Sequence, residues 1–152
     1  MQKFVKTPFE LFRLQTSTSA KLREYTAQKK LGRTSYDLKL DENGMVAPCK
    51  GIVFECPNGM SLRPMGPTLF EIAKNFIGKV AYRIPKETDI PSYFSLYLEH
   101  SDHFSLQTSE ICSLIVFNKR LQDFLETYGE KMSWNEFMKK HVDTFEFPKF
   151  SK

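Results

Sequence analysis

A few side chains that can bind anions or move protons stand at isolated positions in this sequence. Arg13 interrupts the apolar run Phe9–Leu14, and Ser61 and Arg63 follow a glycine turn at Asn58-Gly59. A guanidinium group binds phosphate oxygens through parallel hydrogen bonds, and backbone N–H groups exposed in a turn suit a phosphate or a ribose. An arginine that faces solvent and an ordinary turn give the same pattern, so both interpretations remain open.

His103 is the histidine that could act on a ligand. It follows Asp102 at a predicted hairpin, and Gln107 lies on the same strand face because side chains an even number of residues apart share a face. A histidine at the start of a strand either faces a ligand or is a hydrogen-bonded structural residue.

The cysteines lack the spacing of a metal site. Cys49, Cys56 and Cys112 form no tight pair, whereas structural zinc is usually held by two such pairs. The His100-x-x-His103 pair does not complete a set, so we expect no metal and predict that the thiols are reduced, small buried hydrophobes. A Cys112 nucleophile is disfavoured because its apolar surroundings oppose a thiolate.

Length and composition are those of one folded domain, which we place at residues 1–152. Hydrophobic residues make up 41%, charged residues 26% and aromatic residues 14%, which argues against a disordered chain. No run approaches the ~20 apolar residues of a membrane span, and residues 1–6 lack the apolar centre of a secretory signal. We therefore expect a cytoplasmic protein that does not contact membranes; an effector delivered without a cleavable signal would look the same.

Positive charge is concentrated at the N-terminal end. Residues 1–36 hold eight Lys/Arg and two Asp/Glu, a balance of +6, whereas the whole chain carries +4. The rest is therefore slightly acidic. A basic segment can bind nucleic acid, but no nucleic-acid motif accompanies it, so we rank this partner last.

Hydrophobic periodicity and turn signals predict an α+β fold built on one small mixed sheet. The expected strands lie at residues 9–14, 52–54, 80–84, 94–99 and 103–107. The expected helices lie at residues 20–30, 67–76, 114–128 and 133–142. An irregular loop is expected over residues 33–50, and the aromatic tail at 145–150 is expected to dock on the domain or to pair as an edge strand.

Three segments together resemble the ADP-ribosyltransferase-like toxin family of the second type VI secretion effector and its eukaryotic relatives. They are residues 9–13, 51–67 and 82–125, and the last contains Thr88-Asp89-Ile90-Pro91 and the strand that begins with His103-Phe104. The resemblance implies a compact ADP-ribosyltransferase-like fold, in which a small split mixed sheet flanked by helices forms a cleft for NAD. It also implies toxicity inside cells and a partner immunity protein.

The resemblance also implies roles for individual residues. Arg13 would face a phosphate of NAD, Ser61 the ribose, and His103 the ribose or the nicotinamide, and these three are the expected catalytic residues. Tyr82 and Phe104 would offer stacking surfaces to the nicotinamide ring. The full set of expected NAD-binding residues is Gly59, Met60, Arg63, Tyr82, Phe104 and Gln107.

Two functions follow from this comparison. The first is an ADP-ribosyltransferase that uses NAD and modifies an intracellular acceptor. However, the sequence contains neither the Glu-x-Glu nor the Gln-x-Glu pair with which many such enzymes polarise the ribose, and Phe104 replaces the family's tyrosine. The second is therefore a catalytically degenerate member that binds a protein or a nucleotide.

Overall fold

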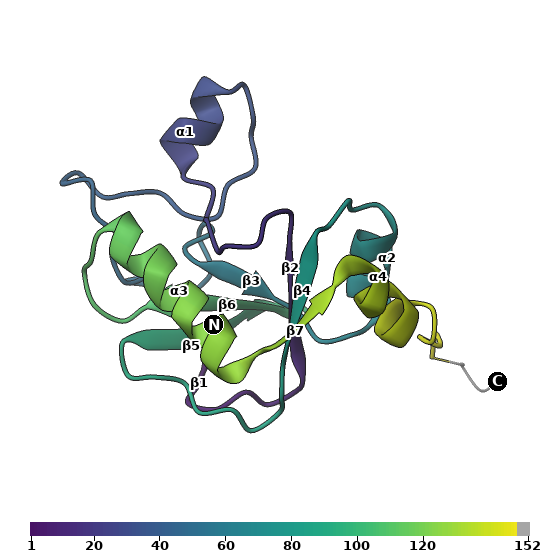
Figure 1. Ribbon diagram of the computed structural model, residues 1–152. Coiled ribbons are helices and arrows are strands. Elements are labelled where there is room, and N and C mark those ends of the chain that lie inside the picture. The colour runs from purple at the N-terminus through teal and green to yellow at the C-terminus, as the bar shows by residue number, and fades with distance from the viewer. Residues whose placement is uncertain (149–152) are drawn as a thin grey trace.

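Two antiparallel sheets form the frame of the protein, whose computed structural model describes residues 1–148 (Figure 1). The four-stranded sheet has the order β1-β5-β6-β3, and the three-stranded sheet has the order β2-β4-β7. The strands are β1 (Gln2–Phe4), β2 (Leu11–Gln15), β3 (Met60–Leu62), β4 (Val80–Ile84), β5 (Phe94–His100), β6 (His103–Thr108) and β7 (Glu130–Ser133). The predicted α+β class with a split sheet is confirmed, and all pairings between these strands are antiparallel rather than mixed.

The two sheets meet at a single backbone joint. The N–H of Phe12 in β2 donates to the carbonyl of Arg63 at 2.7 Å, and the N–H of Arg63 donates back to Phe12 at 3.2 Å. Arg63 directly follows β3, so the joint links the edge strand of one sheet to the edge strand of the other. Beyond this pair of hydrogen bonds β2 and β3 share no ladder.

The main core lies between the apolar face of the four-stranded sheet and α3 (Leu114–Tyr128). Its sheet residues include Met60, Leu96 and Phe104, and α3 contributes four buried residues, Phe117, Leu121, Phe124 and Leu125. Ser113 caps this helix by accepting a hydrogen bond from the N–H of Val116. The sequence predicted both ends of α3 because the apolar period of about 3.6 residues runs through the whole segment.

A second core cluster covers the other face of the three-stranded sheet. There Phe12 and Ala81 pack against α2 (Pro67–Lys74), α4 (Trp134–Phe137) and the π-helix η1 (Met138–Val142). Figure 1 shows these helices at the opposite end of the molecule from α3. Pro67 opens α2 and Ser133 caps α4, as predicted.

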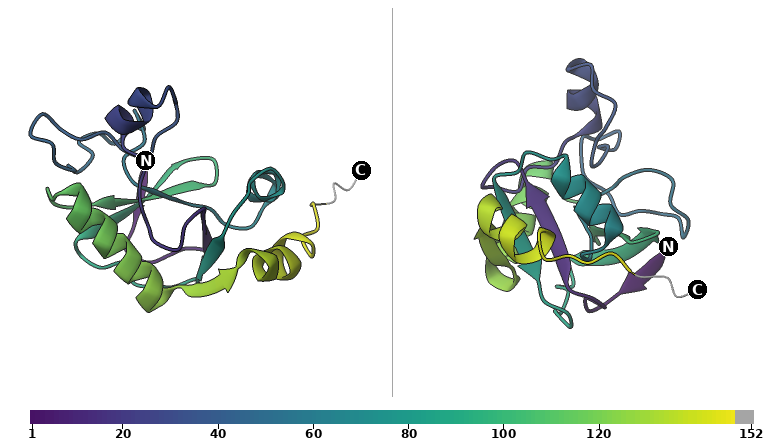
Figure 2. Two further views of the ribbon diagram at one scale, coloured as in Figure 1. Left: turned by 45° about the horizontal axis from the view of Figure 1, so that its top comes forward. Right: turned by 90° about the vertical axis from the view of Figure 1, so that its right-hand side faces the viewer.

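The segment before the first helix is extended, which corrects the helix predicted over residues 20–30. The observed α1 (Tyr25–Lys30) has Glu24 as its N-cap, and it projects from the body of the protein (Figure 2). The N–H groups of Ala20 and Leu22 donate to the side chains of Gln122 and Asn118 on α3. Because these hydrogen bonds and the burial of both residues hold the chain extended, the local helix signal at Ser19 is overridden.

The loop before β3 also differs from the sequence prediction. Ile52-Val53-Phe54 is not a strand, and Ile52 and Val53 are exposed. Instead, Met60–Leu62, directly after the predicted glycine turn at Asn58-Gly59, forms the strand β3, which the sequence did not predict. The apolar run at 52–54 therefore misled the prediction.

The chain end packs on α2. Phe145 and Phe147 each place their ring against Phe70, at centroid distances of 5.6 and 5.0 Å. This agrees with the predicted docking of the tail as far as Pro148, and residues 149–150 of that prediction lie outside the described residues. None of the helices within residues 1–148 has the length and apolar character needed to cross a membrane.

His141 gives the fold a predicted pH dependence. Its ring lies 4.8 Å from the ring of Phe12, its Nε2 atom is buried without a hydrogen-bond partner within residues 1–148, and burial lowers its pKa. The unfolded chain therefore binds a proton at this histidine at higher pH than the folded protein does. The free energy of unfolding should accordingly decrease as the pH falls below about 6.5.

The substitution His141→Phe should make this decrease shallower between about pH 7 and about pH 5, because it removes the titrating group. Urea denaturation at several pH values measures the slope. The exposed His100, replaced by Gln, is the control and should leave the slope close to that of the wild type. Equal slopes for His141→Phe and the wild type would contradict the assignment.

Candidate functional site

A groove opens beside the joint between the two sheets. It consists of two adjoining pockets of about 210 and 250 Å³, which share the lining residues Arg13, Leu14, Arg23, Asp37 and Phe76. We call the combined space the Arg13 groove. The first pocket extends along residues 15–21, and the second is completed by Ser61 and Arg63 of the β3 segment and by residues of α2. The groove therefore occupies the split from which β2 and β3 diverge.

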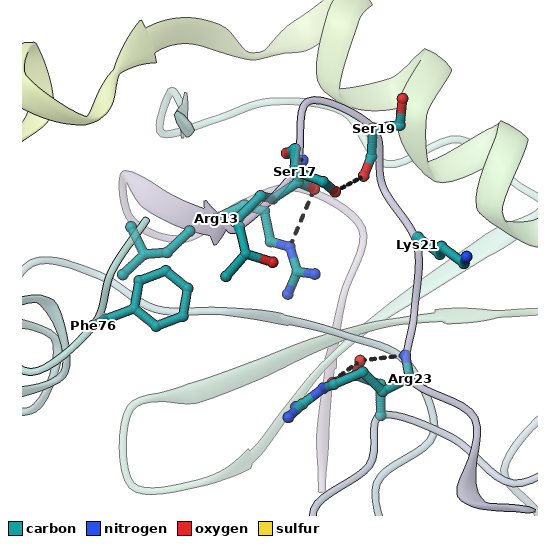
Figure 3. Close-up of a pocket in the computed structure, with 10 residues that line it drawn as sticks. Arg13, Ser17, Ser19, Lys21, Arg23 and Phe76 are labelled. Atoms are coloured by element: carbon teal, nitrogen blue, oxygen red, sulfur yellow. Dashed lines mark hydrogen bonds and ion pairs between the residues drawn. The ribbon is translucent and has the colours of Figure 1, made fainter. Parts of the chain in front are cut away.

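Arg13 is the cation that reaches into this groove from β2. Figure 3 shows its guanidinium group in the pocket, with Phe76 on one side and Arg23 across from it. Its Nε atom contacts Gln15 Oε1 at 3.4 Å, and no carboxylate within residues 1–148 forms an ion pair with it. Burial lowers the pKa of Arg13, and the nearby charge of Arg23 adds to this effect while Asp37 opposes it. The group therefore has unused hydrogen-bond donors facing the groove.

The other two arginines of the groove are already paired. Arg23 makes a two-pronged ion pair with the buried Asp37, at 2.9 Å from its Nη2 and 3.1 Å from its Nε, and this hydrogen bonding raises the pKa of Arg23. Arg63 donates to Asp102 at 2.6 Å. Since both partners are carboxylates of the chain itself, these pairs fix the walls of the groove, and Arg13 is the guanidinium group left for an anion.

Ser61 and His103 are brought together on neighbouring strands. Ser61 pairs with Ser105 in the β3–β6 ladder, and its Oγ atom lies 2.9 Å from Nε2 of His103. On the other side of the imidazole ring, Nδ1 lies 3.0 Å from Oε1 of Glu99. A carboxylate, an imidazole and a hydroxyl thus stand in line, and the hydroxyl belongs to a residue that lines the Arg13 groove.

The hairpin that carries His103 has an irregularity at Glu99. The ladder pairs Leu98 with Phe104 and then His100 with His103, so Glu99 is the extra residue of a β-bulge. Such bulges redirect side chains and often occur beside functional sites. The Arg63–Asp102 ion pair ties the hairpin turn to the end of β3, which holds the two strands of the site together.

Gly59 lets β3 approach β6 closely. A Cβ atom at this position would collide with the backbone carbonyl of Leu106 and would lie 2.9 Å from Ser105 Oγ. The N–H of Gly59 also donates to the carbonyl of Asp37 at 2.9 Å, which connects this turn to the Arg23–Asp37 pair. The predicted glycine turn therefore has a packing role, whereas its N–H is already used within the chain.

Four of the expected NAD-binding side chains are not in the groove. Met60, Tyr82 and Phe104 are at most 1% exposed, because they point into the main core, and none offers a free surface for stacking. The hydroxyl of Tyr82 contacts Gln122 of α3. Gln107 does share the polar sheet face with His103, but it is buried and contacts Asn58 and Ser105.

The cysteines differ from one another in their surroundings. Cys112 is buried beside Thr108, as expected of a small hydrophobe, whereas Cys49 is half-buried and Cys56 is exposed, so the prediction of buried thiols holds for Cys112 alone. Within residues 1–148, no three His, Cys, Asp or Glu side chains cluster in a way that could hold a metal ion.

Comparison with models of known protein families gives a match for the chain. A family model described as Tse2 ADP-ribosyltransferase toxin matches residues 9–137, which include both sheets except β1 and all the residues of the site. The chain belongs to the Tse2 ADP-ribosyltransferase toxin family. Neither the curated proteins nor the solved structures provide a match.

Within this member of the Tse2 family, three residues of the site were not singled out by the sequence. Arg23 was counted only as part of the basic N-terminal segment, while Asp37 and Glu99 carried no signal at all. The spacing of Glu99 and His103 by four residues has no special meaning in a regular strand. Only the bulge and the tight turn between them bring the two side chains into contact.

The substitution Gly59→Ala tests whether this close approach shapes the site. It should lower the free energy of unfolding by about 1–3 kcal/mol, because the added methyl group pushes β3 away from β6. Gly51→Ala is the matched control, since the nearest atom to its Cβ would be Val53 O at 3.4 Å. Urea denaturation compares the two variants, and equal stabilities would show that β3 has room at Gly59.

Proposed function

We propose that the protein transfers ADP-ribose from NAD to an intracellular acceptor and acts as a toxin inside cells. Family membership supports ADP-ribosyl transfer, and the observation that carries the proposal is Arg13, a half-buried guanidinium group that lines the groove and has no ion-paired carboxylate within residues 1–148. A buried cation of this kind is favourable when an anion binds beside it. The pyrophosphate of NAD supplies that anion.

Ser61 completes the proposed binding mode. Its hydroxyl lines the same pocket as Arg13, and the pair with His103 gives it a fixed hydrogen-bond partner on the protein side. With the pyrophosphate on Arg13, the nicotinamide ribose would lie toward Ser61 and His103. The reaction breaks the bond between the ribose and nicotinamide, and groups placed around the sugar accelerate it when they stabilise the charge that develops there.

The partners of this activity follow from the family. We propose NAD as the substrate, an intracellular acceptor of the ADP-ribose, and an immunity protein that blocks the toxin. The competing function is a degenerate member that binds a nucleotide or a protein without turnover. NAD binding without release of nicotinamide would favour that alternative.

The substitution Arg13→Ala tests the proposed phosphate contact. It should weaken NAD binding roughly 10- to 100-fold, the loss expected for a hydrogen bond to a charged group. Arg13→Lys should restore affinity only in part, because a lysine keeps the charge but lacks the two-pronged geometry. Isothermal titration calorimetry measures the dissociation constants, and Arg33→Ala, at an exposed position after α1, is the control.

Nicotinamide riboside separates the phosphate contact from a general loss of the site. This compound lacks the pyrophosphate, so Arg13→Ala should weaken its binding far less than it weakens NAD binding. Equal losses for the two ligands would place Arg13 away from the phosphates. A wild-type protein that neither binds NAD at millimolar concentration nor releases nicotinamide from it would refute the proposed function.

A further inference from the structure

Glu99 is a buried carboxylate with very few interactions. Its side chain is 1% exposed, and within residues 1–148 neither of its oxygens accepts a well-directed hydrogen bond. Nδ1 of His103 lies 3.0 Å from Oε1, and that nitrogen likewise makes no well-directed hydrogen bond within residues 1–148. Transfer of an ionised carboxylate out of water is strongly unfavourable unless a cation or an N–H group compensates it. The imidazole of His103 is the group placed to do so.

Other nearby groups do not replace this contact. Asp102 lies in the same hairpin, but its carboxylate is bound by Arg63 at 2.6 Å. His100 is exposed, and its ring lies at a centroid distance of 5.1 Å from Phe54 and 5.3 Å from His103, not against Glu99. The position of Glu99 in the bulge brings its carboxylate within 3.0 Å of Nδ1 of His103.

The contact determines which nitrogen of His103 carries the proton. A carboxylate beside Nδ1 favours the imidazole form in which Nδ1 is protonated, and Nε2 then has a free lone pair. The Ser61 hydroxyl, 2.9 Å from Nε2, must then donate its proton to that nitrogen. The lone pairs of Ser61 Oγ consequently remain available on the side of the groove. Carboxylate, imidazole and hydroxyl are arranged in this order in serine hydrolases, where the carboxylate also fixes the imidazole tautomer.

We propose that Glu99 is a positioning residue that keeps the proton of His103 on Nδ1 and thereby makes Ser61 a proton acceptor for a hydroxyl group bound in the Arg13 groove. The inference rests on the proposed ADP-ribosyl transfer and identifies its acceptor as a hydroxyl group, water included.

The transfer step balances with the groups on the site. The acceptor oxygen forms a bond to C1 of the nicotinamide ribose, while the bond from C1 to the nicotinamide nitrogen breaks and its electron pair leaves with neutral nicotinamide. The acceptor proton passes to Ser61 Oγ as the proton of Ser61 passes to His103 Nε2. The resulting imidazolium is compensated by Glu99, and its proton is released to water afterwards.

The tautomer of His103 tests the positioning role without any ligand. In wild-type protein labelled with ¹⁵N-histidine, long-range proton–nitrogen NMR spectra should show the Nδ1–H form of His103, and His103→Gln identifies its signals. In Glu99→Gln the Nε2–H form should become populated. An Nε2–H form in the wild-type protein would overturn the proposal, and this readout decides it even if Glu99→Gln does not fold.

Turnover tests the proton-accepting role. Glu99→Gln should lower kcat for nicotinamide release roughly 10²-fold while KM for NAD stays within about threefold, and Ser61→Ala should lower kcat by a similar factor. Glu71→Gln, at an exposed position on α2, is the matched control and should keep the wild-type kcat. A Glu99→Gln variant that folds and retains the wild-type kcat would overturn the proposal.

The two proposals fail in different ways. If the wild-type protein releases no nicotinamide, the proposed function fails and so does the proton-accepting role of Ser61, whatever the tautomer. If NAD is consumed but Glu99→Gln behaves as the wild type, the proposed function stands and the role of Glu99 is refuted.

Discussion

The pair of backbone hydrogen bonds between Phe12 and Arg63 connects the two sheets beside the Arg13 groove. It joins the edge strands of two sheets at one point; both sheets contribute to the main core, and the three-stranded sheet carries the second core on its other face. Because β2 and β3 are held together only there, their side chains diverge beside the joint and leave the Arg13 groove between them. Backbone hydrogen bonds do not depend on side-chain identity, so the walls can vary in sequence while the groove persists.

Electrostatics within the groove are more local than the sequence suggested. The N-terminal segment has a balance of +6, which invited the interpretation of a broad positive field. In the structure Arg23 is neutralised by Asp37, and Lys29, Lys30 and Arg33 lie on or after the projecting helix α1. Within residues 1–148, Arg13 and Lys21 are the cations lining the groove that have no acidic partner, and Arg13 is the guanidinium group of the two. A single half-buried guanidinium group selects anionic ligands by their geometry, whereas a diffuse positive field mainly accelerates the association of any anion with the protein.

The sequence predicted the helices and strands whose signals are local, and its predictions failed where contacts between distant residues determine the local structure. The ends of α3 and β4 follow from periodicity and capping alone. The extended segment before α1 depends on side chains of α3 about a hundred residues away, and β3 depends on pairing with β6. The same division holds in the site. Arg13 and Ser61 were recognisable as polar residues at unusual positions, and the structure places both in the groove. Tyr82 and Phe104 lie in the core instead, because strand register determines which face of the sheet a side chain occupies.

Glu99 shows why a carboxylate can be missed when its role is sought by sequence spacing. Many ADP-ribosyltransferases carry a glutamate two residues after another glutamate or glutamine, and this chain has no such pair. A buried acid nevertheless reaches the site from the neighbouring strand, because the bulge between Leu98 and His100 inserts it beside His103. Glu99 reaches the groove through the imidazole of His103 and the hydroxyl of Ser61, which requires only that three side chains on adjacent strands be aligned. A regular ladder would remove Glu99 from that alignment without changing a single residue of the groove wall, so the bulge is as important to the proposed chemistry as the carboxylate itself.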